Sequence, residues 1–149
     1  MYIATSRDGG RSFASATKLG SKNWLLKACP MDGGAVAVDG AGQLAAVWRR
    51  DSDIFLVQTS PAQERQLGEG QQPWIAADKS GVYAVWLEKR AGRLLLAASA
   101  ADRPTELARA AHDPVVAASP TGHGPVIVAW EAEERGQHVI KATVVVGNH

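Results

Sequence analysis

Short apolar runs, rather than helically spaced apolar positions, dominate the hydrophobic pattern of this 149-residue chain. Typical runs cover residues 35–38, 44–48 and 54–57. Clusters of Asp, Gly, Ser and Pro separate the runs. Such clusters mark hairpin turns, because Gly permits a positive φ and Asp hydrogen-bonds its own backbone. The pattern therefore predicts an all-β protein.

A run that ends in Trp recurs three times, at Trp48, Trp86 and Trp130. The intervals between these residues are 38 and 44 positions, close to the ~40–50 residues of one propeller blade. In each unit a strand closed by a turn precedes the Trp run, and a charged turn and a further apolar run follow it. We therefore expect a β-propeller built from four-stranded antiparallel blades.

The repeat predicts about three and a half blades, a partial or half propeller in one unit spanning residues 1–149. We expect partial blades at residues 1–20 and 114–146 and whole blades at residues 30–70 and 73–111. Residues 2–6 fit the third strand of the first partial blade. Residues 139–146 fit the third strand of the last partial blade.

Two alternatives compete with this architecture. Residues 104–112 are rich in helix formers, but they occupy the place of a fourth strand, so we expect a short outer strand there. A β-sandwich also uses short strands at regular spacing. It does not predict a Trp at the same place in every unit, whereas a large residue on the second strand of each blade fills the layer between neighbouring blades.

Composition and charge narrow the function classes. The chain is 46% apolar and 21% charged, as is typical of a globular protein. Its net charge of +1 gives no global attraction to nucleic acid or to an anionic membrane, so neither is an expected partner. No apolar run approaches the roughly 20 residues of a membrane span. The N-terminal residues lack a secretory signal pattern, and the compartment stays open.

The most specific motif lies at residues 6–13. Its residues Ser6, Asp8, Gly10, Ser12 and Phe13 fill the pattern Ser-x-Asp-x-Gly-x-Thr/Ser-Trp/Phe of an Asp box. We expect a structural turn in which Asp8 accepts backbone N–H bonds, Gly10 takes a conformation that a Cβ would obstruct, and Phe13 is buried against the sheet. On this motif the chain resembles the sialidase-like superfamily of Asp-box, or BNR-repeat, β-propellers.

A second resemblance involves residues 28–34, the Asp39-x-x-Gly42 turn and residues 48–50. These look like segments of uncharacterised bacterial proteins of the sialidase superfamily. Together the two resemblances span nearly the whole chain, as the C-terminal half or so of such a protein. Members of this superfamily are often secreted or periplasmic. The resemblance also implies that the Asp-box turns lie on the face opposite the ligand site.

In sialidase-like propellers, the loops that lead into first strands and those that join second to third strands line the ligand face. The candidate ligand-binding residues mapped to this face are Trp24, Asp32, Arg49, Arg50, Asp51, Glu88, Arg90 and Arg135, and the same rim includes Gln72 and Asp113. Arg49 or Arg50 suits an acidic ligand, because a guanidinium binds a carboxylate in a bidentate fork. A solvated hairpin turn explains the same charges more simply. Trp24 and Trp74 break the register of the repeated tryptophans and are the aromatic candidates for a ligand surface.

The sequence assigns no catalytic residue. Sialidases use an arginine triad, a Tyr nucleophile assisted by a Glu, and an Asp acid/base. The Arg-Ile-Pro signature is absent here, and both tyrosines, Tyr2 and Tyr83, are expected inside strands. The four histidines show no metal-ligand spacing, and Cys29 has no neighbouring His. We expect neither a metal nor a cofactor.

Two functions fit these observations. The leading one is a non-catalytic sialidase-like propeller module for ligand, glycan or protein binding, with a carbohydrate or an acidic small molecule as the expected ligand. The alternative is the C-terminal part of an exo-sialidase-like glycoside hydrolase whose catalytic residues lie largely outside this chain, so enzymatic activity is left open. Because propellers close with ~4–8 blades, we also expect a homodimer that completes the propeller if the chain is whole.

Overall fold

The computed structural model describes residues 1–25, 33–59, 62–99, 101–119 and 124–145. Within these ranges the chain forms strands and turns but no helix, which confirms the all-β prediction. The described part accordingly contains no helix of the length and apolar character needed to cross a membrane.

Every described sheet is an antiparallel meander, in which strands that follow one another in the chain are neighbours. The first sheet pairs β1 (Tyr2–Ile3) with β2 (Thr17–Lys18). The second contains β3 (Ala35–Val38), β4 (Leu44–Arg50), β5 (Asp53–Thr59) and β6 (Ala62–Glu69). The third contains β7 (Gln71–Ala77), β8 (Val82–Leu87), β9 (Leu94–Ala98) and β10 (Thr105–Ala108). The fourth contains β11 (His112–Ala117), β12 (Val126–Glu134) and β13 (Gln137–Val145).

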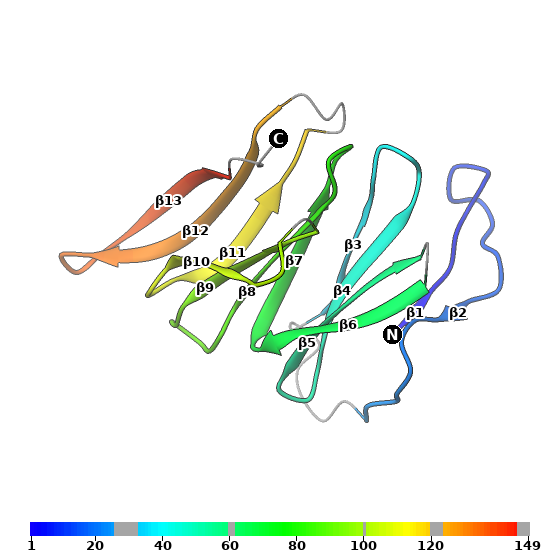
Figure 1. Cartoon of the computed structure of the whole chain (residues 1–149), viewed down its shortest axis with the longest axis horizontal. Coiled ribbons are helices and arrows are strands. Elements are labelled where there is room, and N and C mark those ends of the chain that lie inside the picture. The colour runs from blue at the N-terminus through cyan, green and yellow to red at the C-terminus, as the bar shows by residue number, and fades with distance from the viewer. Residues whose placement is uncertain (26–32, 60–61, 100, 120–123, 146–149) are drawn as a thin grey trace.

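The four sheets lie side by side as layers (Figure 1). The first strand of the third sheet, β7, contacts the first strands β3 and β11 of the sheets on either side. No described sheet closes on itself. This arrangement of four-stranded antiparallel sheets is consistent with a partial, propeller-like fold. The number of blades and their boundaries stay predictions.

Apolar layers between the sheets hold the fold together, and each contains one of the repeated tryptophans. Trp48 packs between the first and second sheets, Trp86 between the second and third, and Trp130 between the third and fourth. Their exposed fractions are 4%, 0% and 8%. The prediction that these three residues fill the layers between sheets is confirmed.

Trp86 shows how closely the layers approach one another. Its indole Nε1 donates a hydrogen bond of 3.1 Å to the carbonyl of Glu69, at the end of β6. Gly70 follows, and a Cβ at this position would lie only 2.3 Å from Cδ1 of Trp86. The connection between the second and third sheets therefore requires glycine at residue 70.

The burial of the second strand of a sheet depends on whether the sheet has a neighbouring sheet on both faces or on one. All six residues of β8 are buried, because a sheet covers each face of that strand. In β12, by contrast, Val126, Val128 and Trp130 are buried while Ile127 is 42% exposed. The fourth sheet is therefore covered on one face only.

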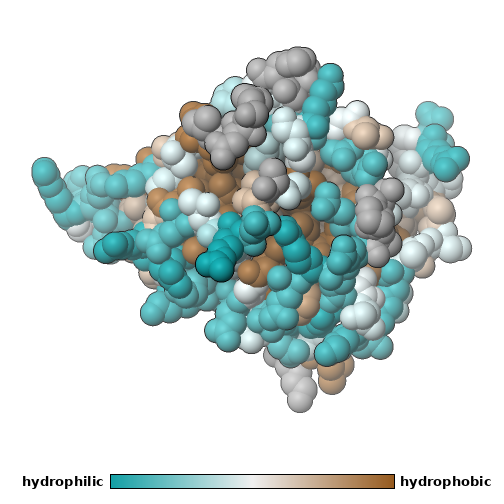
Figure 2. Space-filling model, in the orientation of Figure 1, coloured by the Kyte–Doolittle hydropathy of each residue, from teal (hydrophilic) through white to brown (hydrophobic). Residues whose placement is uncertain are grey.

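The uncovered face of the fourth sheet, called the open face below, carries Val115, Ile127, Ile140 and Val144, which are 42–72% exposed. Ile127 and Ile140 take the register positions that Tyr83 and Leu94 take in the third sheet. There the two side chains are buried under the fourth sheet. The open face thus has the apolar character of a face that another sheet covers. In the view of Figure 2, hydrophobic residues also show between the sheets, and hydrophilic residues cover the outer turns.

The segment with competing helix and strand tendencies forms β10 (Thr105–Ala108), which confirms the predicted short outer strand. It pairs with β9 through an irregular register between Glu106 and Ala108. Leu107 and Ala108 pack against the layer that contains Trp130. Burial of these two residues and pairing with β9 therefore outweigh the local helix propensity.

Candidate functional site

The two ends of the sheets differ in the residues they present. In a meander, the start of the first strand and the turn between the second and third strands lie at the same end. Figure 1 shows the β4–β5, β8–β9 and β12–β13 turns toward the lower and left edges of the view, while the loop of residues 6–13 lies at the upper right. The candidate ligand residues and the Asp-box motif therefore occupy opposite ends.

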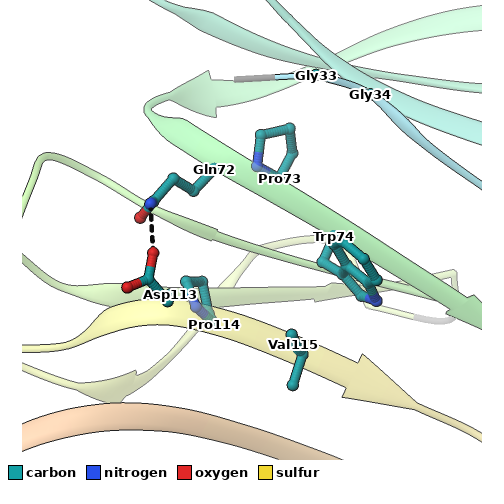
Figure 3. A pocket seen from close by; sticks show the side chains of 8 residues that line it. All are labelled: Gly33, Gly34, Gln72, Pro73, Trp74, Asp113, Pro114 and Val115. Atoms are coloured by element: carbon teal, nitrogen blue, oxygen red, sulfur yellow. Dashed lines mark hydrogen bonds between the residues drawn. The ribbon is translucent and has the colours of Figure 1, made fainter. Parts of the chain in front are cut away.

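A pocket of about 290 Å³ lies at the end that carries the candidate ligand residues. It is formed where the chain leads into the first strands of three successive sheets (Figure 3). The lining residues are Gly33, Gly34, Gln72, Pro73, Trp74, Asp113, Pro114 and Val115. The pocket thus lies where β3, β7 and β11 begin, and we name it the β7–β11 pocket.

The polar side of the β7–β11 pocket is a hydrogen-bonded pair. Nε2 of Gln72 donates to Oδ1 of Asp113 over 2.7 Å, across the gap between β7 and β11 (Figure 3). Both residues have a left-handed backbone, with φ of 51° and 44°. Each directly precedes a proline, and each lies where the strand register shifts. Two β-bulges therefore aim these side chains at one another.

This backbone geometry is strained. A residue before proline avoids the left-handed region, and a non-glycine residue there costs on the order of 1–3 kcal/mol. The same conformation nevertheless occurs at the equivalent positions of two successive sheets, Gln72-Pro73 and Asp113-Pro114. Such strain is concentrated at ligand and active sites, which makes the pocket the first candidate functional site.

The apolar side of the β7–β11 pocket is formed by Trp74 and Val115. These residues are 47% and 44% exposed, although large apolar side chains elsewhere in β7 and β11, Ile75 and Val116, are buried. Trp74 therefore offers an accessible indole in the same pocket as the Gln72–Asp113 pair, with Pro73 and Pro114 between them (Figure 3). This combination suits a ligand with both apolar and hydroxyl-bearing surfaces.

A second depression of about 390 Å³ lies beside the β4–β5 turn. It is lined by Ser21, Lys22, Arg50, Asp51, Asp53, Phe55, Glu64 and Gln66. Arg50 is only 8% exposed; its guanidinium lies 3.7 Å from the ring centroid of Phe55, and its Nη2 lies 2.5 Å from Oε1 of Glu64. The contacts of Arg50 are therefore made within the fold.

Glu64 connects three segments of the chain. It accepts hydrogen bonds from Arg50 in β4 and from the backbone N–H of Ser21 in the loop after β2. Burial by itself raises the pKa of Glu64, but these hydrogen bonds outweigh burial, and the pKa is lowered. The carboxylate is thus held in its charged form as a structural anchor.

The remaining predicted ligand residues are scattered over the rim. Nε of Arg49 donates to the carbonyl of Asp51, which takes a left-handed φ of 55° in the β4–β5 turn. Glu88 forms an ion pair with Arg93, whose hydrogen bond lowers the pKa of Glu88. Arg90 and Arg135 are exposed in turns, Trp24 is half-buried in the loop after β2, and Asp32 lies outside the described residues.

The structure brings Arg50 and Asp51 together in the second depression, and none of the seven predicted ligand residues that it describes lines the β7–β11 pocket. The sequence did contain a signal for this pocket. An X-Pro pair begins two successive repeats at the same place, and Trp74, which breaks the register of the other tryptophans, follows the first of them. Gln72 and Asp113 fell on the expected rim, and Trp74 was an aromatic candidate for a ligand surface, but the sequence interpretation did not combine the three into one site.

The loop of residues 6–13, where the sequence predicts an Asp box, is organised around Asp8. Its Oδ1 accepts the backbone N–H groups of Arg11 and Ser12, and its Oδ2 accepts the Ser12 hydroxyl over 2.6 Å. Ser6 Oγ donates to Asp8 and accepts the N–H of Gly10, which takes a φ of 87°. Phe13, by contrast, is 64% exposed, so the expectation that it is buried was wrong. The described β1–β2 sheet has two short strands and offers little surface to cover this ring.

Hydrogen bonds from the side chain and backbone of Ser12, and then from Ser6, lower the pKa of Asp8 from 3.8 to about 2. Any stabilisation from this carboxylate is therefore present above pH 3.8 and is lost as the pH falls toward 2. We expect Ser12→Ala to raise the pKa of Asp8, because the bond to Oδ2 is lost. A carbon-detected NMR titration of the Asp8 carboxyl group measures this. Ser15→Ala, which removes a nearby hydroxyl outside the bonds just described, should leave the titration midpoint unchanged; equal shifts in the two variants would contradict the assignment.

Neither tyrosine takes part in the β7–β11 pocket as described. Tyr83 is 6% exposed in the apolar layer, and burial, followed by the charge of Asp78, raises its pKa. Tyr2 lies in β1. Both positions agree with the prediction that the tyrosines are in strands. Within the described residues, no group of three or more His, Cys, Asp or Glu side chains is placed to hold a metal ion.

Meandering sheets stacked as layers, with their first strands as neighbours, define the class of fold as β-propeller-like. Among solved structures, the chain is similar to the crystal structure of a subtype N11 neuraminidase-like protein of A/flat-faced bat/Peru/033/2010 (H18N11), with a TM-score of 0.54 and 7% sequence identity. The similarity covers 97% of this chain and 42% of that one, so this chain spans less than half the length of the neuraminidase-like protein. No protein-family model matches the sequence, and a search of curated proteins gives no match. At this identity the likeness is one of fold alone.

Proposed function

We propose that this chain is a non-catalytic, sialidase-like propeller module that binds carbohydrate in the β7–β11 pocket. The observation that carries the proposal is a pocket that combines the half-exposed indole of Trp74 with the hydrogen-bonded pair of Gln72 and Asp113. The pocket volume of about 290 Å³ falls at the small end of ligand pockets, which measure ~300–1,000 Å³. It accommodates a single sugar ring better than an extended chain.

The chemistry of the lining supports a sugar ligand. A pyranose ring has an apolar C–H face, which packs on an indole, and an edge of hydroxyl groups, which need hydrogen-bond partners. The Asp113 carboxylate accepts hydrogen bonds, and the Gln72 amide can both donate and accept. Gln72 and Trp74 lie on β7 and Asp113 on the neighbouring β11, and all three side chains line the one pocket.

The same lining favours binding without hydrolysis. Most glycosidases place two carboxylates across the scissile bond, and sialidases use a Tyr nucleophile. The described residues that line the β7–β11 pocket include one carboxylate, Asp113, and no tyrosine. The proposal also assigns the chain to the Asp-box, BNR-repeat propellers. The hydrogen bonds within the loop of residues 6–12, which are centred on Ser6 and Asp8, support this assignment.

The alternative function is part of an exo-sialidase-like glycoside hydrolase. The observation that favours it is the likeness to a neuraminidase-like protein, of which this chain spans 42%. Release of product from a chromogenic sialoside by the purified chain would support this alternative and contradict the binding-only proposal. The homodimer expected from the blade count stays a prediction.

The binding proposal predicts a specific NMR response. When ¹⁵N-labelled protein is titrated with a panel of monosaccharides, the indole N–H signal of Trp74, assigned from Trp74→Phe, should shift in a saturable manner. Trp74→Ala should abolish binding, because the stacking surface is removed. Trp24→Ala, which changes a half-buried tryptophan outside the pocket, is the matched control and should bind as the parent does. If no sugar of the panel shifts the Trp74 signal, the proposed function is wrong.

A further inference from the structure

The geometry points to an uncharged or cationic sugar, and against an acidic one, as the ligand of the β7–β11 pocket. This inference rests on the proposed function and specifies its ligand class. It departs from the sequence-based expectation of an acidic small molecule, which depended on Arg49 and Arg50. Neither arginine lines the β7–β11 pocket, and the guanidinium of Arg50 is engaged by Glu64 and Phe55.

Charge is the first argument. Of the eight described residues that line the pocket, Asp113 alone has an ionisable side chain, and it is an acid. No lysine, arginine or histidine is among these described residues. A ligand carboxylate in the pocket would approach the Asp113 carboxylate with no cation among the described lining residues to offset the repulsion. The pocket therefore disfavours uronic acids and sialic acids.

Hydrogen-bonding capacity is the second argument. A carboxylate offers about four lone-pair sites, all acceptors. The Gln72 amide takes up one of them, at Oδ1 of Asp113. What Asp113 can bind further is a donor, such as a sugar hydroxyl or an ammonium group. A ligand carboxylate has no proton to donate and cannot use this capacity.

Positioning is the third argument. Gln72 and Asp113 both have left-handed backbones, and each is followed by a proline that lines the pocket between this pair and Trp74 (Figure 3). Pro73 and Pro114 are buried, and a proline ring fixes its own φ. The carboxylate is therefore presented by a rigid support on two adjacent strands. An acidic ligand cannot avoid it by displacing a mobile loop.

Sugars that share one ring and differ in the charge of a single substituent test this inference. Glucuronic acid, glucose and glucosamine share one ring and carry a negative, zero and positive charge at mildly acidic pH; the galactose series repeats the set with one hydroxyl inverted. Binding of each is followed through the Trp74 indole signal. We expect glucose and glucosamine, or their galactose counterparts, to bind at least about fivefold more tightly than the uronic acid, with a smaller ratio at high salt.

Asp113→Asn isolates the role of the charge. The amide keeps the shape of the side chain, so the ratio between neutral and acidic sugar should fall to about one even if overall affinity changes. Asp51→Asn, which neutralises an exposed carboxylate in the β4–β5 turn outside the pocket, should leave the ratio unchanged. A merely structural role of Asp113 would lower both affinities together and keep their ratio.

The outcomes separate the inference from the proposed function. Equal or tighter binding of the uronic acid, or of N-acetylneuraminic acid, overturns the charge preference while carbohydrate binding stands. A ratio that Asp113→Asn leaves unchanged also overturns it. If no sugar in either series binds, the carbohydrate-binding proposal fails, and the inference fails with it.

Discussion

Replacing Trp86 by Ala is expected to lower the free energy of unfolding by about 3–5 kcal/mol, the cost of removing a large aromatic side chain from a packed core. Trp86 is fully buried between the second and third sheets, and its loss also leaves the Glu69 carbonyl without its indole donor. Domains of this size have a total free energy of unfolding of about 5–15 kcal/mol, so the expected loss is a large fraction of the total. The midpoint of urea unfolding, followed by circular dichroism, measures the effect.

Trp74→Ala is the matched control for this substitution. It removes the same side chain from the neighbouring strand of the same sheet, but at a position that is 47% exposed. A surface substitution of this kind changes stability by about 0.5 kcal/mol. If Trp86→Ala does not fold, the conservative Trp86→Phe still tests the idea with a smaller loss. Equal losses at the two positions would contradict the layered packing.

Arg50→Ala is expected to cost about 3 kcal/mol, the lower end of the range for breaking a buried ion pair by removing one partner. The substitution leaves Glu64 without its guanidinium and removes the cation from the face of Phe55. Because the folded pKa of Glu64 is lowered, the stabilisation from this pair is present above the unfolded pKa of Glu64 and is lost as the pH falls through its folded pKa. The difference between Arg50→Ala and the parent should therefore shrink in acid, as urea unfolding at a series of pH values would show.

Two further variants identify the contacts responsible. Arg50→Lys keeps the charge but not the planar fork, so it should fall between the parent and Arg50→Ala. Arg90→Ala removes an exposed arginine from the β8–β9 turn and should change stability little. If Arg50→Ala were no more costly than Arg90→Ala, the structural role assigned to Arg50 would be contradicted.

The strand order was predictable because it follows from local patterns. Asp39, Gly42 and their counterparts mark the turns, and the repeated tryptophans locate the second strand of each sheet. Even β10, with its competing helix propensity, follows from its place in the repeat. When the chain repeats, a unit with a clear pattern indicates which element an ambiguous segment forms at the same place in another unit. A single segment considered alone does not give this indication.

The candidate site was less predictable, since it depends on where side chains meet across strands. Arg50 was a candidate ligand residue in the sequence. Its partner Glu64 lies on β6, 14 positions further along the chain, so the sequence pattern around Arg50 does not reveal this contact. Gln72 and Asp113 meet only because both adopt left-handed conformations that a residue before proline normally avoids. Propensity rules predict the backbone conformation that each residue type usually adopts, and a strained site departs from that conformation.

The open face of the fourth sheet gives the stack of sheets a polarity. At the other end, the β1–β2 sheet presents Tyr2, which is 64% exposed, beside Lys18. These two surfaces are unlike in residues and in strand number, so any contact that joins them between copies is heterologous, head to tail. Such a contact either closes into a ring or propagates into a filament, and the rotation from one copy to the next decides which. A charged substitution at Ile140 would then disrupt the open face, which is one of the two surfaces in every such contact, while leaving the β1–β2 surface unchanged.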